Sequence, residues 1–256
     1  MTRATPRTNF HSSHLIRCLV DLAVVEAVEP DNSFAEKLSQ WIHFTDAIKL
    51  SAVHNDGSAN SATALATAAA DTRAAVDLEF DRVQATLTNS IRKSCTPALG
   101  KSHIPLPAPI LALPLHLATA YSPYHRFYNA HQRDMELSVR PLRTNVREAL
   151  AKTSPALKRL ADMDAVLETI LRERERKLLG KVPLLLKKRF EHLFKVHQQR
   201  LIDSQQADHP AGWTQPGAWL ALFHNDLQIL LLAELELRLQ PSQGLLESLN
   251  NELINA

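Results

Sequence analysis

The chain has 256 residues, 45% of them hydrophobic and 22% charged, so it is long enough to bury a sizeable core and is not of disordered composition. Only 6 residues are glycine, and hairpin turns and phosphate-binding loops draw on glycine for positive φ angles. The net charge is only +2, which does not single out a nucleic-acid-binding or membrane-surface protein. The composition leaves little room for parallel sheets, hairpins or phosphate loops, and it predicts an all-α protein.

The charge is unevenly distributed along the chain. Residues 1–120 hold 10 basic and 11 acidic side chains, residues 121–200 hold 18 and 9, and residues 201–256 hold 1 and 7. The sequence therefore has a basic middle and an acidic end.

The N-terminal part shows two amphipathic patterns separated by a turn. The first predicts a helix over residues 13–28, and the second begins at Ser33, where Glu36 completes a capping box. An Ala/Thr tract over residues 59–75 then passes into a helix that we expect to dock weakly, since alanine buries little surface.

Five prolines between Pro97 and Pro114 exclude a helix or a central strand and predict an extended linker. The expected organisation is an N-terminal helical region (1–95), a Pro-rich linker (96–120) and a long-helix C-terminal bundle (121–256).

The C-terminal part predicts long helices. One starts at Ser122–Pro123 and runs to about Ala151, and Pro141 is expected to kink it or end it one turn early. The next starts at Ser154–Pro155 with the apolar spacing of a coiled coil, interrupted at Asp164.

Gly180 and Pro183 divide this pattern, which resumes to Leu201. The last long helix should start near Thr214 and, being apolar on most sides, should be a buried central helix. We expect it to stop at Pro241, before a short terminal helix. The predicted fold is an all-α bundle of long antiparallel, partly coiled-coil-like helices with a smaller N-terminal helical part.

No motif in the sequence supports catalysis. Gly100-Lys101-Ser102 lacks the earlier glycine of a phosphate loop, and among the histidine pairs weighed only His11 and His14 have a spacing that suits a helical metal site. Glu234 and Glu236 point to different faces of the last helix and are interpreted as its solvated edge. We expect no enzyme activity, no cofactor and no metal.

The cellular location is inferred from what the sequence lacks. No apolar leader follows Met1, and no apolar run is long enough to span a bilayer. Cys18 and Cys95 lie on different segments without the spacing of metal ligands, as expected of free thiols in a reducing compartment. We expect a cytoplasmic protein.

Aromatic and basic residues gather just after the linker, where all three tyrosines lie. The candidate partner-binding residues are Tyr121, Tyr124, Arg126, Tyr128 and Arg133. The favoured alternative is a helix start that packs amphipathic rings over the edge of the core.

A second cluster spans residues 172–200 and has a net charge of +7. Its representatives are Arg172, Arg176, Lys187, Lys188 and Arg189, a basic stripe that could neutralise phosphates or lie against anionic lipid. The favoured alternative is a solvated helix face that pairs with the acidic C-terminal segment.

Several stretches resemble an uncharacterised bacterial family of the DUF3348 type. Four stretches carry the resemblance: residues 33–48, residues 133–143, residues 182–190 and residues 231–246. The matching parts within them are 33–41 and 45–48, 133–136 and 141–143, 182–185 and 189–190, and 231–235, 238–241 and 244–246. The resemblance carries over no catalytic residue. It implies a cytoplasmic accessory of an envelope complex, because members of the family are encoded beside a motor-stator-like membrane protein and a peptidoglycan-binding partner.

Two functions lead from the sequence, and an enzyme whose site is assembled from scattered residues is a weaker third. The first is a non-enzymatic structural or adaptor protein whose long amphipathic helices bind a partner protein or a second copy. The alternative is a nucleic-acid-binding protein that uses the basic helix over residues 172–200.

Overall fold

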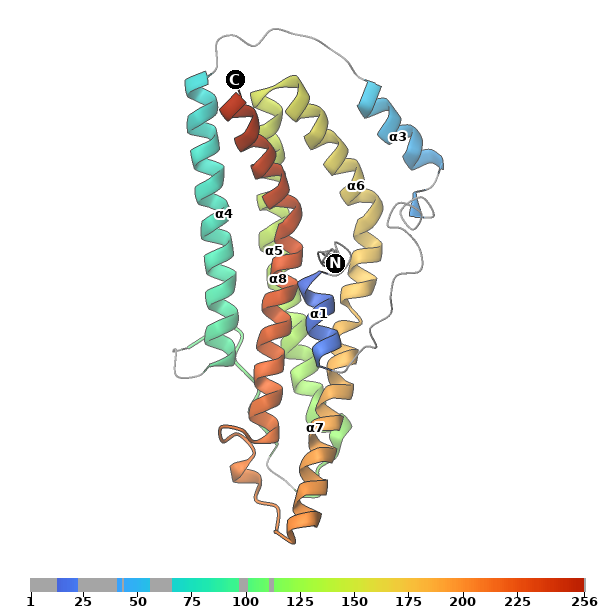
Figure 1. Cartoon of the computed structure of the whole chain (residues 1–256), viewed down its shortest axis with the longest axis vertical. Coiled ribbons are helices and arrows are strands. Elements are labelled where there is room, and N and C mark those ends of the chain that lie inside the picture. Colours follow the sequence, from blue (N-terminus) through green and yellow to red (C-terminus); the bar gives the residue numbers. More distant parts are fainter. Residues whose placement is uncertain are drawn as a thin grey trace, which may run out of the picture.

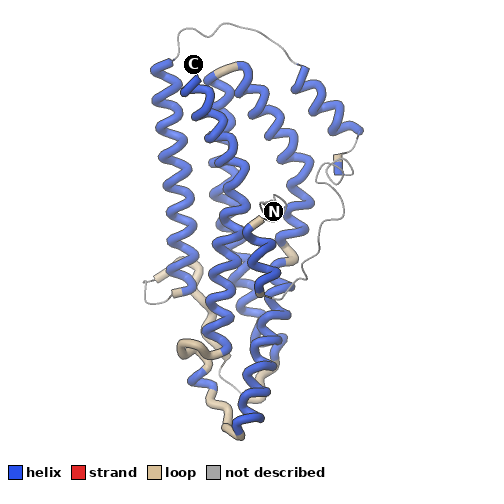
Figure 2. Tube along the Cα trace, in the orientation of Figure 1, coloured by secondary structure: helices blue, strands red, loops and turns tan. Residues whose placement is uncertain are grey.

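The computed structural model describes residues 13–22, 41–42, 44–55, 66–96, 101–110 and 113–255 as a bundle of helices (Figures 1 and 2). These residues form the helices α1 (His14–Asp21), α3 (Phe44–Asn55), α4 (Ala66–Cys95), α5 (Leu117–Thr153), α6 (Pro155–Leu179), α7 (Val182–Ser204) and α8 (Trp219–Asn255) and the short 3-10 turn η2 (Pro210–Gly212). They contain no strand, and the predicted all-α bundle is confirmed.

Two parallel helices, α5 and α8, form the centre of the bundle. Side-chain contacts join Tyr124 to His224 and Tyr128 to Glu234, so the residue numbers of the two helices rise together. α4 packs against both of them, while α6 and α7 run antiparallel to α5 on the other side (Figure 1). The pair α5/α8 is therefore an exception to the antiparallel arrangement predicted from the sequence.

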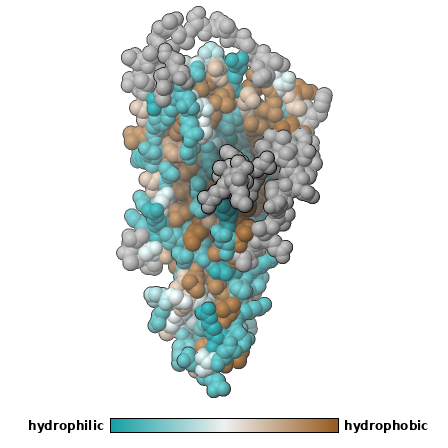
Figure 3. All heavy atoms as spheres, viewed as in Figure 1, coloured by the Kyte–Doolittle hydropathy of each residue, from teal (hydrophilic) through white to brown (hydrophobic). Residues whose placement is uncertain are grey.

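One hydrophobic core runs through α1 and α4 to α8. It includes Leu15 of α1, Ile91 of α4, Leu142 of α5, Phe190 of α7 and Leu230 of α8. Hydrophobic residues show in the seam between α4 and α8 in Figure 3, and hydrophilic residues cover the outer side of α4. The helices before and after the proline-rich segment thus share a single core.

The expected break between α6 and α7 and the start of α6 are confirmed. Ser154 caps α6, since its Oγ accepts a hydrogen bond from the backbone N–H of Leu157 at 3.2 Å. α6 ends at Leu179 and α7 begins at Val182, around Gly180.

Several predicted helix boundaries are wrong. α5 begins at Leu117, five residues before Ser122, whereas it passes Pro141 and ends at Thr153, close to the predicted end near Ala151. α8 likewise continues through Pro241 to Asn255, where a stop and a separate terminal helix were predicted. A proline removes one backbone hydrogen bond, and here the buried residues on both sides of each proline keep the helix packed on its neighbours.

The N-terminal predictions can be compared only in part. α1 covers His14–Asp21 of the helix expected over residues 13–28, and α4 begins at Ala66 within the Ala/Thr tract. The capping box at Ser33 and Glu36 lies outside the described residues.

The proline-rich segment is without helix over residues 101–110, as expected of a linker. Among the residues described, no helix combines the length and apolar character needed to cross a bilayer.

Candidate functional site

The three tyrosines of the predicted partner-binding cluster lie in the core. Tyr121, Tyr124 and Tyr128 are buried, and the rings of Tyr121 and Tyr124 pack against Phe190 and Phe223. Burial raises the pKa of the Tyr121 and Tyr124 hydroxyls. These rings therefore join α5 to α7 and α8, as the packing alternative describes, and they are not a surface for a partner.

Two buried histidines accompany the tyrosines. His131 stacks edge-on against Phe127, and the ring nitrogen of His224 lies 3.1 Å from the Tyr124 hydroxyl. Burial lowers the pKa of both imidazoles to about 4.

We expect these histidines to make the fold acid-sensitive. Since both remain neutral in the folded state and protonate near pH 6.5 when unfolded, stability should be complete above that pH and fall as the pH drops toward 4. The slope should reach about 1.4 kcal/mol per pH unit for each histidine. Urea unfolding between pH 7 and pH 4 measures it.

His131→Leu should flatten the pH dependence, whereas His192→Gln, at an exposed position, should leave it unchanged. An identical slope in the parent protein and His131→Leu would contradict the assignment.

The basic stripe is paired at four of its five predicted positions. Arg172 bonds Glu168, Arg176 bonds Glu173, Lys187 lies 3.8 Å from Glu191, and Arg189 bonds Asp226 at 2.8 Å. Of these acids only Asp226 comes from the acidic C-terminal segment, so most of the pairing is local to α6 and α7.

The structure brings exposed cations of the two predicted clusters onto neighbouring helices. The Tyr121 hydroxyl donates to the Pro183 carbonyl, and Gln132 Nε2 donates to the Leu179 carbonyl at 3.0 Å, so residues 121–132 of α5 lie beside the start of α7. Arg126 and Arg133 of α5 and Lys181, Lys188 and Lys195 at α7 are all exposed. None of these five has an ion-pair partner within the described part of the chain.

Each row of cations faces away from the core of its own helix. Arg126 and Arg133 are seven residues apart, as are Lys181, Lys188 and Lys195, so each row follows one side of a helix with steps of about 10 Å. The buried residues of α7, such as Leu186, Phe190 and Leu193, lie on its opposite side.

Exposed leucines are interleaved with these cations. Leu137, four residues after Arg133, is 69% exposed, and Leu184, between Lys181 and Lys188, is 57% exposed. These residues lie on the outer sides of the neighbouring helices α5 and α7, and we name the set of Arg126, Arg133, Leu137, Lys181, Leu184, Lys188 and Lys195 the basic face. Of the two acidic residues of α7, Glu191 pairs with Lys187 and Asp203 accepts from Gln199 at the far end of the helix.

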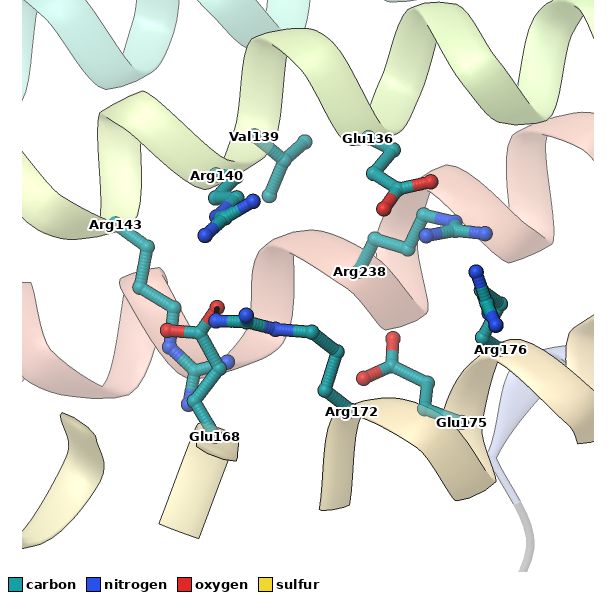
Figure 4. A pocket seen from close by; sticks show the side chains of 9 residues that line it. All are labelled: Glu136, Val139, Arg140, Arg143, Glu168, Arg172, Glu175, Arg176 and Arg238. Atoms are coloured by element: carbon teal, nitrogen blue, oxygen red, sulfur yellow. Dashed lines mark hydrogen bonds and ion pairs between the residues drawn. The ribbon is translucent and has the colours of Figure 1, made fainter. Parts of the chain in front are cut away.

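A charged cleft lies where α5, α6 and α8 meet (Figure 4). Five arginines, three glutamates and one valine line it: Arg140, Arg143, Arg172, Arg176, Arg238, Glu136, Glu168, Glu175 and Val139. Side chains of all three helices point into the same space in Figure 4. We name it the arginine cleft.

An ion-pair network fixes the α5–α6 wall of the arginine cleft. Asp164 accepts from Arg143 Nε at 2.9 Å and from Arg147 Nε at 2.7 Å, and Arg147 and Arg172 both bond Glu168. These arginines hold the pKa of the Asp164 and Glu168 carboxyl groups below the ordinary value, against the effect of burial. The network explains why a carboxylate interrupts the apolar stripe of α6.

The interpretation of Glu234 as a solvated edge is wrong. Glu234 is fully buried on α8 and accepts hydrogen bonds from Tyr128 Oη at 3.0 Å, from Gln132 Nε2, and from Arg238 Nε at 2.9 Å. Its partners lie on α5 and one turn along α8, so no local spacing signalled it. Glu236, two residues on, is exposed and pairs with His14 at 2.7 Å.

The histidine pair considered for a metal site can be compared with the structure only at His14. His14 bonds Glu236, and His11 is outside the described residues. No three His, Cys, Asp or Glu side chains within the described ranges come together as metal ligands would. Cys18 and Cys95 are free, and burial raises the pKa of the Cys95 thiol to about 12.

A model of the family described as "Protein of unknown function (DUF3348)" matches residues 1–251. The chain belongs to this family, as the resemblance predicted. No curated protein and no solved structure matches the chain.

Proposed function

We propose that this member of the DUF3348 family is a non-enzymatic adaptor that binds a protein partner through the basic face. The observation that carries the proposal is the combination on that face of exposed cations without ion-pair partners and exposed leucines. The partner it fits is an amphipathic helix or surface that presents carboxylates together with apolar side chains.

The leucines favour a protein over a nucleic acid. Leu137 and Leu184 are among the most exposed large hydrophobic side chains described, and both lie within the rows of cations. A phosphate backbone offers them nothing apolar, whereas a protein partner removes their surface from water, at roughly 25 cal/mol per Å². The rigid core beneath the face means that little has to be ordered on binding.

The second candidate is nucleic-acid binding through α7. Lys181, Lys188 and Lys195 form a straight row about 20 Å long with no ion-pair partner in the described structure. Phosphates could take the place of carboxylates along it. The binding constant would then fall steeply as salt is added. On a double-logarithmic plot against salt concentration, its slope would be close to −1 for each phosphate neutralised.

We also propose that the adaptor works in the bacterial cytoplasm, as an accessory of an envelope complex. This part rests on the family resemblance. Fractionation of source cells tests it: the protein should be released from membranes by salt, and retention after a high-salt wash would oppose it.

The binding proposal predicts the behaviour of a defined probe. A labelled helical peptide with glutamates and leucines on one face should bind the protein in a fluorescence anisotropy titration. Replacing Arg133, Lys188 and Lys195 together by glutamate should weaken binding at least about tenfold, because three attractive charges become repulsive.

The matched control replaces Arg92, Lys93 and Lys158, three exposed cations outside the basic face, by glutamate. It makes the same change in net charge and should keep the affinity. Equal losses in the two triple variants would contradict a specific face. Tighter binding of duplex DNA than of the peptide, lost in the first variant, would favour the second candidate.

A further inference from the structure

We infer that the arginine cleft binds a small, multiply charged oxyanion such as phosphate or pyrophosphate. The inference goes beyond the adaptor function, and no residue of the arginine cleft belongs to the basic face.

Arg140 is the clearest indication. Its side chain is exposed on α5 at the mouth of the arginine cleft and has no hydrogen bond or ion pair among the described residues. Arg143, one turn further along α5, is by contrast held by Asp164. The α5 side of the arginine cleft therefore offers one guanidinium held in place and one that has all five N–H donors available.

The other arginines also keep unused donors. Arg172 bonds Glu168 through one terminal nitrogen, and Arg176 bonds Glu173 through one terminal nitrogen. Arg238 bonds Glu234 through Nε and one terminal nitrogen, leaving the other terminal nitrogen without a described partner. Guanidinium N–H groups from α5, α6 and α8 thus face one space, and an oxyanion could accept from all three helices at once.

Arg140 is the lining arginine without an ion pair among the described residues. The other four are paired: Arg143 with Asp164, Arg172 with Glu168, Arg176 with Glu173 and Arg238 with Glu234. Glu168 is already bonded to Arg147 and Arg172, and only Glu136 and Glu175 have no described partner. An oxyanion that accepts from Arg140 and from the unused N–H donors of the paired arginines has more oxygens to offer as phosphate than as acetate.

The size of the arginine cleft limits the ligand. It encloses about 80 Å³, several times the roughly 10 to 15 Å³ that one water needs. Pockets for nucleotides and other larger molecules measure about 300 to 1,000 Å³. The enclosed space suits phosphate or pyrophosphate and does not enclose a whole nucleotide.

Binding should tie α6 to α8. The two helices have few contacts of their own. An anion held by Arg176 of α6 and Arg238 of α8 would bridge them, so a saturating anion should raise the unfolding temperature.

The test is calorimetric titration of the full chain with sodium phosphate and pyrophosphate, with thermal unfolding at constant ionic strength maintained by sodium chloride. We expect saturable binding and a higher unfolding temperature. The double variant Arg140→Gln/Arg176→Gln should weaken binding at least about tenfold, the loss expected for two charge-assisted contacts.

The control variant Arg126→Gln removes an exposed arginine of α5 outside the arginine cleft and should bind phosphate as the parent does. Should either variant fold poorly, Arg140→Lys provides a second comparison: it keeps the charge and should retain part of the affinity. An equal response in the parent and the double variant, or no saturable heat, would overturn the inference.

The same phosphoryl chemistry exists on a phosphorylated side chain. A parallel titration with a short phosphoserine peptide separates the sources: tighter binding than phosphate assigns the site to a protein-borne group, and weaker binding to the free ion. Loss of peptide binding at the basic face leaves this result untouched, so the two proposals fail separately.

Discussion

Glu234→Ala should destabilise the protein by about 3 to 5 kcal/mol. The carboxylate of Glu234 is fully buried and satisfies Tyr128, Gln132 and Arg238. Its removal leaves a guanidinium that is only 14% exposed without its partner, and a buried hydroxyl without its acceptor. Urea unfolding at pH 7 measures the loss.

The matched control is Glu236→Ala, two residues along the same helix. Glu236 is exposed, and its pair with His14 lies at the surface, so the expected cost is about 1 kcal/mol or less. The double variant Glu234→Met/Arg238→Met should lose less than Glu234→Ala, because no charge is then left unpaired. Equal unfolding free energies for Glu234→Ala and Glu236→Ala would refute the structural role assigned to Glu234.

Phe223→Ala should cost about 3 to 5 kcal/mol. The ring is fully buried on α8 and packs against Tyr124 and Phe190, with centroids 5.3 and 5.0 Å apart. It therefore joins the three helices α5, α7 and α8 at one level, and its removal leaves a cavity among large rings that have little freedom to collapse.

Leu222→Ala, at the adjacent position, is the control. Leu222 is half-exposed on the same helix, and we expect a change of about 0.5 kcal/mol. Thermal unfolding should rank the two variants in this order, and comparable losses would contradict the packing at Phe223.

Most of the helices could be predicted from the spacing of apolar residues and from residues that cap or break helices. Gly180 and Ser154 act locally, through a break and a cap, and both were identified correctly. Pro241 carries an equally strong local signal and was misjudged as a helix end, and Pro141 does not end α5 early. Burial along α5 and α8 outweighs one lost hydrogen bond, and burial is not a local property.

Polar groups in the interior were the least predictable. Asp164 stood out because it breaks an apolar stripe, but its partners Arg143 and Arg147 lie 21 and 17 residues away on another helix. Glu234 gave no signal at all, since its spacing from Glu236 suggests a surface and its partner Tyr128 is 106 residues distant.

The residues of the candidate site could be picked out from the sequence, but where their side chains lie in the fold could not. The tyrosines and arginines after the linker were identified as one cluster, and the structure separates them, with rings inward and Arg126 and Arg133 outward. Leu137 and Leu184 have the same spacing as core leucines, so only the packing of α5 beside α7 shows that they are exposed. That α7 lies beside α5 depends on tertiary contacts that no motif encodes.

The most direct measurement of the adaptor proposal is site-specific photo-crosslinking in cells that naturally express the protein. A photoreactive amino acid placed at Leu137 or Leu184 should capture the same protein species. The control position is Leu78 of α4, which is 70% exposed and lies outside the basic face, and it should capture none. A shared species at both face positions, lost when Arg133, Lys188 and Lys195 become glutamate, is the predicted result. No crosslinked species, or the same species at Leu78, would contradict it.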